Sequence, residues 1–438
     1  MRITVYLHAN PRHHCYVGTM MQLLARHGLA VARDILTYSP SLLIEGARQV
    51  GKSTLAGQLA SETDALVVNL DDQDARAAAT EDPVGFVTQA GDRCLIIDEI
   101  QRVPTITLTL KSAIDTDRRP GRFILTGSSS LLRVKGLADS LAGRVGRLSL
   151  YGFSQGELSG HVEDFSTTAT ELSPSLIHHH TTSNARSDYA RIIATGSYPD
   201  ATGLTDHQRS RWLDDYLQAL IRRDLPELRR IVRPDRVMSV LRLLAAHQSG
   251  ELVKAKLSQE AGIPTSTIDS YLDLLAQLWL VAVIPTWTPN LSQREVARPK
   301  SLIVDSGLAT RLCRLTSEQL ATLEYGGAFG MLLEGFVASE LMKQRTWTQT
   351  DFELYHYRDR SGVEVDFIME RSDGIVALEV KSAASFQSSH FKGLKFLRDK
   401  LGDRFIAGVV LNTGSKGYRF SDRLYGLPIS ALWELGAS

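Results

Sequence analysis

The sequence has few cysteines, no excess of charge of either sign and no long apolar run. Its three cysteines among 438 residues are odd in number and lack metal-ligand spacing, so no disulfide framework is expected. Lys plus Arg and Asp plus Glu number 49 each, so any basic surface must be local. No window approaches a membrane-spanning length, and the N-terminus lacks the apolar core of a signal peptide. These absences predict a cytoplasmic protein without a membrane partner.

The length and the local patterns predict an α/β protein of several domains. A chain of 438 residues exceeds one ordinary core, and 43% hydrophobic with 22% charged residues is typical of globular proteins. Short apolar segments alternate with helical patterns, which predicts a mostly parallel sheet covered by helices. The region 160–188 is rich in Ser, Thr and His without a period, which predicts a long loop or insertion. The first strands are expected at 41–45, 66–70, 94–98 and 122–127.

The segment 46-GARQVGKS-53 follows the first expected strand and opens a helix. This spacing is typical of a P-loop, in which backbone N–H groups and a helix N-terminus hold nucleotide phosphates. Lys52 is expected to reach the β- and γ-phosphates, and the Ser53 hydroxyl to bind Mg²⁺. The alternative, a chance Gly-Lys turn, is disfavoured by the strand before and the helix after the loop. The predicted nucleotide-binding residues are Gly46, Ala47, Arg48, Gln49, Val50, Gly51, Lys52, Ser53 and Thr54.

Further catalytic candidates follow the next two expected strands. Asp98 ends an apolar strand where it can meet the metal, and Glu99 beside it is a candidate general base, unless the pair is only an acidic strand end. Ser128 is a candidate γ-phosphate sensor, although serine is also a common turn former. Arg144 is the candidate arginine finger, with Arg147 as its rival, and either can instead be a surface charge.

Four segments in this order carry a family resemblance: GARQVGKS, LIIDEIQRVP, RFILTGSSSLL and LAGRVGRLSLYGFSQGEL. They resemble the prokaryotic AAA+-type ATPases related to the archaeal ATPase group, which carry a C-terminal domain of unknown function. The family's usual loop reads Gly-Pro-Arg-Gln-Val-Gly-Lys-Thr, so Ala47 and Ser53 depart from it, and serine has the same metal chemistry as threonine. The resemblance implies ATP rather than GTP, and covers nearly the whole chain apart from its start and the 160–188 region.

A second pattern, between 252 and 287, consists of a helix, a Gly-Ile-Pro turn, another helix and a strand. This order is typical of a winged helix-turn-helix, which binds DNA in many proteins. A protein-binding or interdomain winged helix is the open alternative. The residues that could contact phosphates are Lys254, Lys256, Thr265, Ser266 and Thr267.

The third pattern lies near the C-terminus. Asp366 is expected on one strand and Glu379 and Lys381 on the same face of the next, because side chains alternate along a strand. Glu334, on an expected helix at 331–343, could add another carboxylate. Carboxylates can hold Mg²⁺ and a lysine can orient water for phosphodiester hydrolysis. The arrangement resembles the PD-(D/E)xK restriction-endonuclease-like fold, which also includes inactive binding modules, and an ordinary amphipathic hairpin is the alternative.

The expected function is ATP binding with Mg²⁺-dependent hydrolysis, coupled to binding or processing of DNA or another nucleic acid. The alternative is an ATP-dependent regulatory or protein-interaction switch whose nuclease-like domain is inactive. Assembly as a homo-oligomer stays open. The expected divisions are an N-terminal helical segment (1–35), an AAA+-type P-loop domain (36–155), a loop or insertion (156–190), a helical connector (191–235), a winged-helix-like module (236–295) and a nuclease-like α/β domain (296–438).

Overall fold

The computed structural model describes residues 24–128, 143–225, 233–290, 292, 294 and 297–435. They form two compact units, which are described separately. The N-terminal unit contains residues 24–45, 52–127 and 143–148, and the C-terminal unit contains the remaining described residues. No helix in these ranges is both long and apolar enough to cross a membrane. The first residues of the expected N-terminal helical segment lie outside the described ranges, and its end overlaps helix α1 (Gly28–Tyr38).

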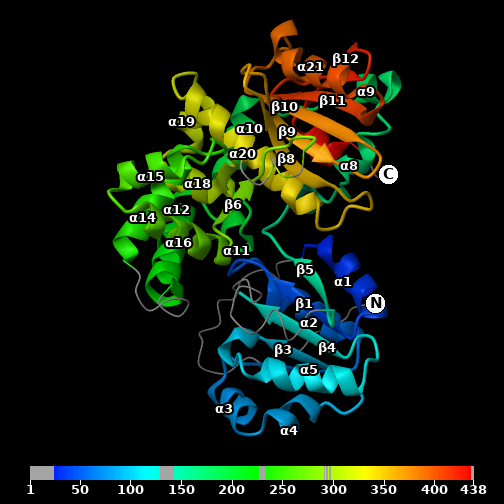
Figure 1. The fold of residues 1–438 in the computed structure, drawn as a ribbon, viewed down its shortest axis with the longest axis vertical. Coiled ribbons are helices and arrows are strands. Elements are labelled where there is room, and N and C mark those ends of the chain that lie inside the picture. The colour runs from blue at the N-terminus through cyan, green and yellow to red at the C-terminus, as the bar shows by residue number, and fades with distance from the viewer. Residues whose placement is uncertain are drawn as a thin grey trace. The chain divides into compact units, whose positions relative to one another are not determined.

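A five-stranded sheet in the order β2-β3-β4-β1-β5 forms the centre of the N-terminal unit (Figure 1). Strands β1 to β4 pair in parallel, as the alternation of strands and helices predicted. Every residue of β1, β3 and β4 is buried. Strands covered on both faces are apolar along their whole length, which is why these strands were recognisable in the sequence. The strands are β1 (Ser41–Glu45), β2 (Ala65–Asn69), β3 (Cys94–Asp98), β4 (Phe123–Gly127) and β5 (Val145–Ser149).

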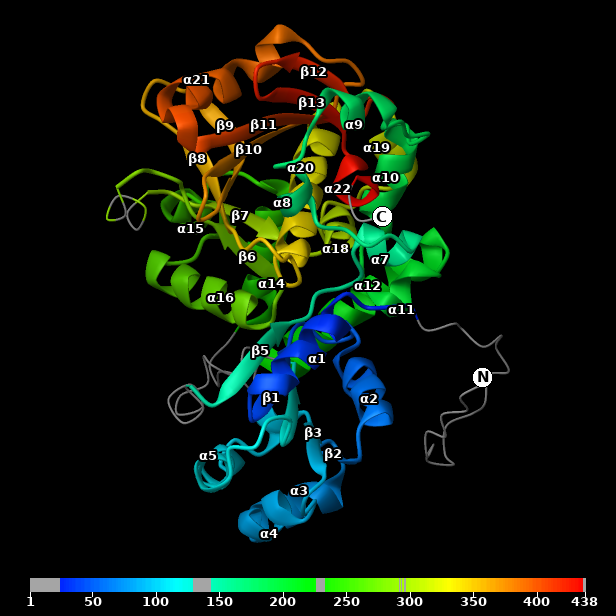
Figure 2. The same cartoon turned by 90° about the vertical axis from the view of Figure 1, so that its right-hand side faces the viewer.

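Helices cover both faces of this sheet. Helix α2 (Lys52–Glu62) packs on β1 to β4, and Figure 2 shows it on one side of the sheet with α5 (Ile106–Thr116) on the other. After β2 the chain forms α3 (Gln73–Glu81) and α4 (Pro83–Thr88). Helix α3 begins where it does because the Asp72 carboxylate accepts the N–H groups of the first turn. The helices therefore connect consecutive parallel strands and leave the carboxyl ends of β1, β3 and β4 at one edge of the sheet.

The region from 156 to 190, expected to be a loop or an insertion, contains helices, so the loop was wrong and the insertion stays a prediction. Asp164 and Ser173 accept backbone N–H groups at the start of two of these helices. Phe165 and Ile177 are 0% and 1% exposed, so the segment contributes to the core. Helices of four to six residues are too short to show a 3.6-residue period, and their capping Ser and Asp are also turn residues. The helices are α7 (Gln155–Ser159), α8 (Phe165–Thr168), α9 (Pro174–His179) and α10 (Arg186–Thr195).

The middle of the chain is helical and contains the expected helix–turn–helix. Helix α15 ends at Gly262, whose φ of 62° lies in the left-handed region that favours glycine. The pair is followed by β6 (Val281–Ile284), which pairs antiparallel with β7 (Lys300–Ile303). Assignment of this part to the winged-helix class stays a prediction. The helices are α11 (Pro199–Thr202), α12 (Asp206–Ala219), the π-helix Leu220–Asp224, α14 (Pro234–Ala246), α15 (Lys254–Ala261), α16 (Thr265–Gln277), α18 (Ser306–Leu312) and α19 (Ser317–Ala321).

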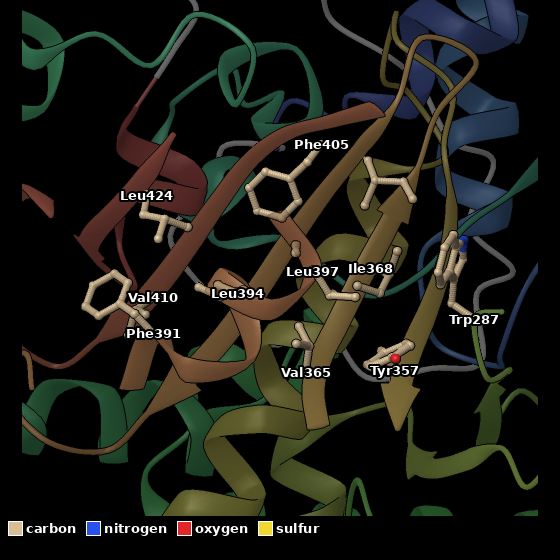
Figure 3. Packing of buried hydrophobic residues seen from close by; sticks show 12 residues of the cluster. Trp287, Tyr357, Val365, Ile368, Phe391, Leu394, Leu397, Phe405, Val410 and Leu424 are labelled. Atoms are coloured by element: carbon tan, nitrogen blue, oxygen red, sulfur yellow. The ribbon is translucent and has the colours of Figure 1, made fainter. Parts of the chain in front are cut away.

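A six-stranded sheet in the order β12-β13-β11-β10-β9-β8 forms the last part of the chain. Neighbours among β8, β9 and β10 are antiparallel, whereas β10, β11 and β13 run parallel. Figure 3 shows Leu394 and Leu397 of α21 packed among residues of the sheet such as Phe405 and Val410. Each fully buried side chain of this size stabilises the fold by roughly 1.5–3 kcal/mol. The elements are α20 (Gly326–Gln344), β8 (Glu353–Arg358), β9 (Glu364–Glu370), β10 (Ile375–Lys381), α21 (Lys392–Leu401), β11 (Phe405–Asn412), β12 (Tyr418–Ser421), β13 (Leu424–Pro428) and α22 (Ala431–Glu434).

Candidate functional site

The loop 46–51 joins β1 to α2. Gln49 and Gly51 have φ values of 64° and 94°, so the chain turns through the left-handed region twice before the helix begins. Gly51 suits this position because it has no Cβ to clash. Lys52 opens α2 and is 5% exposed, and Ser53 follows it. The sequence thus places a tight glycine turn before a helix N-terminus, the arrangement that presents backbone N–H groups to anions.

Ser53 and Asp98 lie in direct contact, as required if both bind one metal ion. The Ser53 hydroxyl donates to Asp98 Oδ1 at 3.0 Å. Asp98 is the last residue of β3 and is 7% exposed. A hydroxyl and a carboxylate are oxygen ligands of the kind that Mg²⁺ prefers, with water filling its other positions. These two residues therefore fit a Mg²⁺ ion.

Thr126, on β4, is a member of this site that the sequence analysis did not predict. Its hydroxyl donates to Asp98 Oδ1 and accepts the backbone N–H of Glu99 at 3.1 Å. Thr126 is fully buried, so neither hydrogen bond is exchanged with water. Its only sequence signal is a hydroxyl residue one position before the end of an apolar strand, ILTG. Thr126 therefore fixes the end of the neighbouring strand that carries both acids.

Glu99 has a left-handed backbone conformation, with a φ of 57°. Such a φ is uncommon for residues other than glycine and costs of order 1 kcal/mol, so the surroundings must hold it in place. The turn directs the chain from β3 into the 3₁₀ helix Ile100–Arg102. Glu99 Oε2 accepts a hydrogen bond from the side chain of Gln101, a second residue that the sequence analysis missed. The carboxylate of the candidate base is thus oriented by its own turn.

Ser128, the candidate sensor, and Arg144, the candidate arginine finger, have different surroundings. Ser128 directly follows β4 and is 5% exposed. Arg144 donates from Nε and Nη2 to the two carboxylate oxygens of Asp115 on α5, each at 2.8 Å. The hydrogen bond from Arg144 is the largest cause of the lowered pKa of Asp115. Arg147 is exposed. Arg144 therefore has an acidic partner in its own unit, and the finger role stays a prediction.

The four residues of the C-terminal candidate site lie together. Strands β9 and β10 pair antiparallel, which sets Asp366 beside the end of β10. One Asp366 oxygen accepts the N–H of Val380 at 2.9 Å, and Lys381 Nζ lies 2.5 Å from Glu379 Oε1. Glu334 reaches the same cluster from α20, where the charge of Asp366 acts on it. These side chains therefore lie close together, and their role as a nuclease site stays a prediction.

A buried lysine that the sequence analysis missed joins the cluster. Lys300, on β7, places Nζ 2.8 Å from Glu334 Oε1, 3.3 Å from Glu364 Oε1 and 3.4 Å from Asp366 Oδ1. Its side chain is 3% exposed. Lysine is rarely buried unless paired, so one lysine before an apolar strand gave no reason to expect it here. The cluster therefore contains two lysines, of which the sequence predicted one.

Burial and mutual repulsion change the protonation of this cluster. Burial raises the pKa of Glu334 to about 8 and that of Glu379 to about 7, and the charge of Asp366 adds to both. Burial alone would lower the pKa of Lys300. The negative charges of Glu334 and Asp366 outweigh burial, so the pKa of Lys300 lies above its usual value. Lys300 therefore stays charged at neutral pH.

The phosphate-contact candidates in the helix–turn–helix have acidic partners. Lys254 Nζ lies 2.7 Å from Asp269 Oδ1, and Lys256 Nζ lies 3.7 Å from Glu260 Oε1. Thr265, Ser266 and Thr267 stand at the start of α16. Lys254 is thus partly neutralised by an acid of α16, and Lys256 by an acid of its own helix α15.

Three family models match successive parts of the chain. Residues 38–159 match a model described as an AAA domain, residues 186–319 a domain of unknown function (DUF8612), and residues 329–432 another domain of unknown function (DUF4143). Together with the loop motif, the first match defines an AAA-type P-loop ATP-binding domain in the N-terminal part of the chain. The other two descriptions name no activity.

Relatives that match nearly the whole of this chain are known from mycobacteria. The uncharacterized proteins Mb2031c of Mycobacterium bovis and Rv2008c of Mycobacterium tuberculosis are each 27% identical over 423 residues, which is 95% of this chain and 86% of each relative. Among solved structures, a Walker-type ATPase of Pyrococcus abyssi is 16% identical with a TM-score of 0.42, covering 66% of this chain and 96% of that one. A STAND signal-transduction ATPase of Pyrococcus horikoshii is 12% identical with a TM-score of 0.19, covering 76% of this chain and 48% of that one. TM-scores of this size carry no argument about this chain.

Proposed function

We propose that this protein binds and hydrolyses Mg²⁺·ATP at the loop 46–53. The observation that carries the proposal is the hydrogen bond between Ser53 and Asp98, because it joins the loop helix to the acid that a P-loop ATPase needs. The match of residues 38–159 to an AAA domain supports it.

Each residue then has a separate role. Lys52 binds the β- and γ-phosphates, and Ser53 with Asp98 holds the metal ion. A bound Mg²⁺ would neutralise charge that develops on the phosphates. Glu99 orients the attacking water and accepts its proton, which suits a carboxylate set just beyond Asp98. Thr126 is a positioning residue, since it fixes Asp98 and the backbone of Glu99.

Substitution of the loop lysine tests this proposal. Lys52→Ala should lower ATP turnover at least about 100-fold, because the phosphates lose their fixed positive charge. Lys111→Ala, on α5 of the same unit, is the control and should leave turnover unchanged. Phosphate release with purified full-length protein measures both. Equal turnover of the Lys52→Ala variant and the wild type would refute the assignment of the loop.

We propose further that the C-terminal sheet domain has a restriction-endonuclease-like fold and binds single-stranded nucleic acid. The helix carrying Glu334 and the strands carrying Asp366 and Glu379 support the fold. The binding proposal rests on the edge strand β12, where Tyr418 and Phe420 are 57% and 39% exposed. Both side chains line a cavity of about 400 Å³.

Cations surround these exposed rings. Lys395 Nζ lies 5.0 Å from the centre of the Phe420 ring, and Lys416 lines the same cavity. Within the described parts of the chain, Lys392, Lys395, Lys416 and Arg419 have no carboxylate partner. An exposed ring near cations that have no carboxylate partner suits single strands, because a base can stack on Tyr418 while phosphates contact the cations. A protein with equal numbers of acidic and basic residues thus has a local basic surface.

Binding to a labelled oligonucleotide tests the second proposal. Tyr418→Ala should weaken binding of a single-stranded oligonucleotide roughly 5- to 100-fold, since stacking is worth about 1–3 kcal/mol per base. Tyr38→Ala, at a tyrosine of the N-terminal unit that is 64% exposed, is the matched control. Fluorescence anisotropy at low salt gives both affinities, which should fall as salt rises. If no oligonucleotide binds at low salt, the protein-interaction switch becomes the better interpretation, whereas the ATPase proposal is unaffected.

A further inference from the structure

The carboxylate cluster at the edge of β9 and β10 already contains its own cations. Lys300 engages one oxygen of Glu334 and one of Asp366, at 2.8 and 3.4 Å. The second Asp366 oxygen accepts a backbone N–H, and Lys381 engages one oxygen of Glu379. Both carboxylate oxygens of Asp366, and one oxygen each of Glu334 and Glu379, therefore have partners from this chain.

The backbone of Lys300 is held on both sides. It pairs with Ile284 of β6 on one side and forms a bridge with Glu251 on the other. Next to it, the N–H of Leu252 donates to the carbonyl of Pro299 at 2.7 Å. With a side chain only 3% exposed, Lys300 keeps its ammonium inside the cluster and away from solvent.

The fold resemblance implies a divalent metal ion at these acids, and the oxygens of Glu334 and Asp366 that Lys300 contacts do not fit one while Lys300 is present. Magnesium binds carboxylate oxygens at about 2.0–2.1 Å. An ion bonded to the Glu334 oxygen that Lys300 contacts would therefore lie within about 5 Å of the ammonium nitrogen. In a buried site, like charges at this distance repel strongly. The cluster thus differs from an acidic pocket that waits for a metal.

We propose that Lys300 is the resident cation of this cluster, in the place of a divalent metal ion, so that the C-terminal domain does not cleave nucleic acid. This inference goes beyond the proposed ATPase and binding functions. It separates the two lysines by role: Lys381 occupies the position of the motif lysine, whereas Lys300 neutralises the acids that would bind the metal. The domain then resembles a nuclease in its acids while acting as a binding module.

Metal binding by nucleotide-free full-length protein tests the proposal, with Mn²⁺ as the probe and isothermal titration as the readout. The wild-type protein should not bind Mn²⁺ at this cluster, so any Mn²⁺ binding that it shows should be unchanged in the Asp366→Asn variant. Lys300→Met should acquire Mn²⁺ binding at this site, on the order of 100-fold or more tighter than the detection limit that bounds the wild type. The double variant Lys300→Met with Asp366→Asn should again show no Mn²⁺ binding at this cluster. Lys343→Met removes a different buried lysine paired with a carboxylate, and as the control it should acquire no Mn²⁺ binding that Asp366→Asn abolishes.

Two results would overturn the proposal. One is Mn²⁺ binding by the wild type that Asp366→Asn abolishes, and the other is a folded Lys300→Met variant that acquires no Mn²⁺ binding. If Lys300→Met does not fold, cleavage of plasmid DNA by the wild type decides. No cleavage with Mn²⁺ or Mg²⁺ is expected, and cleavage lost in Asp366→Asn would refute the inference. ATP turnover, measured in parallel, reports the N-terminal site independently, so failure of one proposal is distinguishable from failure of the other.

Discussion

Thr126→Val removes the one hydroxyl that connects β4 to both candidate catalytic acids. Valine has nearly the volume of threonine, so the core keeps its packing while two hydrogen bonds are lost. Asp98 loses a donor and the backbone N–H of Glu99 loses an acceptor, both at a fully buried position. A hydrogen bond to a charged group contributes about 1.5–3 kcal/mol, and an extra buried methyl group returns about 1 kcal/mol. We expect the free energy of unfolding to fall by roughly 1–2 kcal/mol.

The same loss should reduce catalysis more than nucleotide binding. If the missing 1–2 kcal/mol positions Asp98 in the transition state, kcat should fall roughly 5- to 30-fold. Affinity for ATP should change little, because Lys52 and the loop remain. The Mg²⁺ concentration that gives half-maximal rate should rise, since Asp98 is less well oriented for the metal. Steady-state phosphate release at varied Mg²⁺, together with a fluorescent ATP analogue for binding, separates these quantities.

Two variants serve as controls. Thr126→Ser keeps the hydroxyl, so its kcat should stay within about threefold of wild type although the lost methyl group costs about 0.5–1.5 kcal/mol of stability. Thr107→Val removes another buried hydroxyl of the same unit, one that donates only to the Pro104 carbonyl at 2.7 Å. It should lower stability without changing the Mg²⁺ dependence. If Thr126→Val behaves like Thr107→Val in kcat and Mg²⁺ dependence, the positioning role of Thr126 is wrong.

Three further predictions concern the C-terminal unit. Burial raises the pKa of Glu163 from 4.5 to about 8, and the charge of Glu340 is the second cause. Folding therefore binds a proton between these pH values, and the free energy of unfolding should fall as the pH rises through them. Glu163→Gln should flatten this decline in urea unfolding between pH 5 and 8, and an unchanged slope would contradict it. Lys343→Met should cost about 3–5 kcal/mol, because it leaves Glu340, 0% exposed and bonded to it at 2.5 Å, without a counter-charge; a loss below 1 kcal/mol in the same assay would contradict this. Gly393→Ala should destabilise the protein by roughly 2–3 kcal/mol, because the new Cβ would lie 2.4 Å from a backbone oxygen of β9. Gly330→Ala on α20 would meet no atom within 4 Å and should stabilise the protein by up to about 1 kcal/mol. Equal melting temperatures for the two variants would refute the contrast.

The sequence predicted strands β1 to β4 of the N-terminal sheet to within one residue. Strands β1 and β3 have the bounds expected from apolar runs between turn residues, because burial on both faces leaves these strands almost without polar residues. The loop 46–53 was equally recognisable, since glycine, lysine and hydroxyl positions there are fixed by local geometry. Local patterns therefore sufficed wherever local chemistry determined the structure.

The contacts that the sequence analysis missed depend on residues far apart in the chain. Lys300 is defined by Glu334 and Asp366, 34 and 66 positions away, and no period or spacing rule connects them. Thr126 acts on Asp98, 28 positions away on a neighbouring strand. In the region 156–190, short capped helices contain the same residues as turns, so composition predicted a loop. These features required the pairing of strands and the packing of helices to be known.

The position of Lys300 bears on where the C-terminal domain begins. The family model for this part starts at residue 329, after Lys300 and after Trp287, which belongs to the core around α21 and donates its indole N–H to Glu370. A fragment cut at that boundary would contain buried carboxylates without their ammonium and a core without its tryptophan. The smallest autonomous piece of this half should therefore reach back at least to β6, and a fragment of this chain that begins at residue 329 should be expected to misfold.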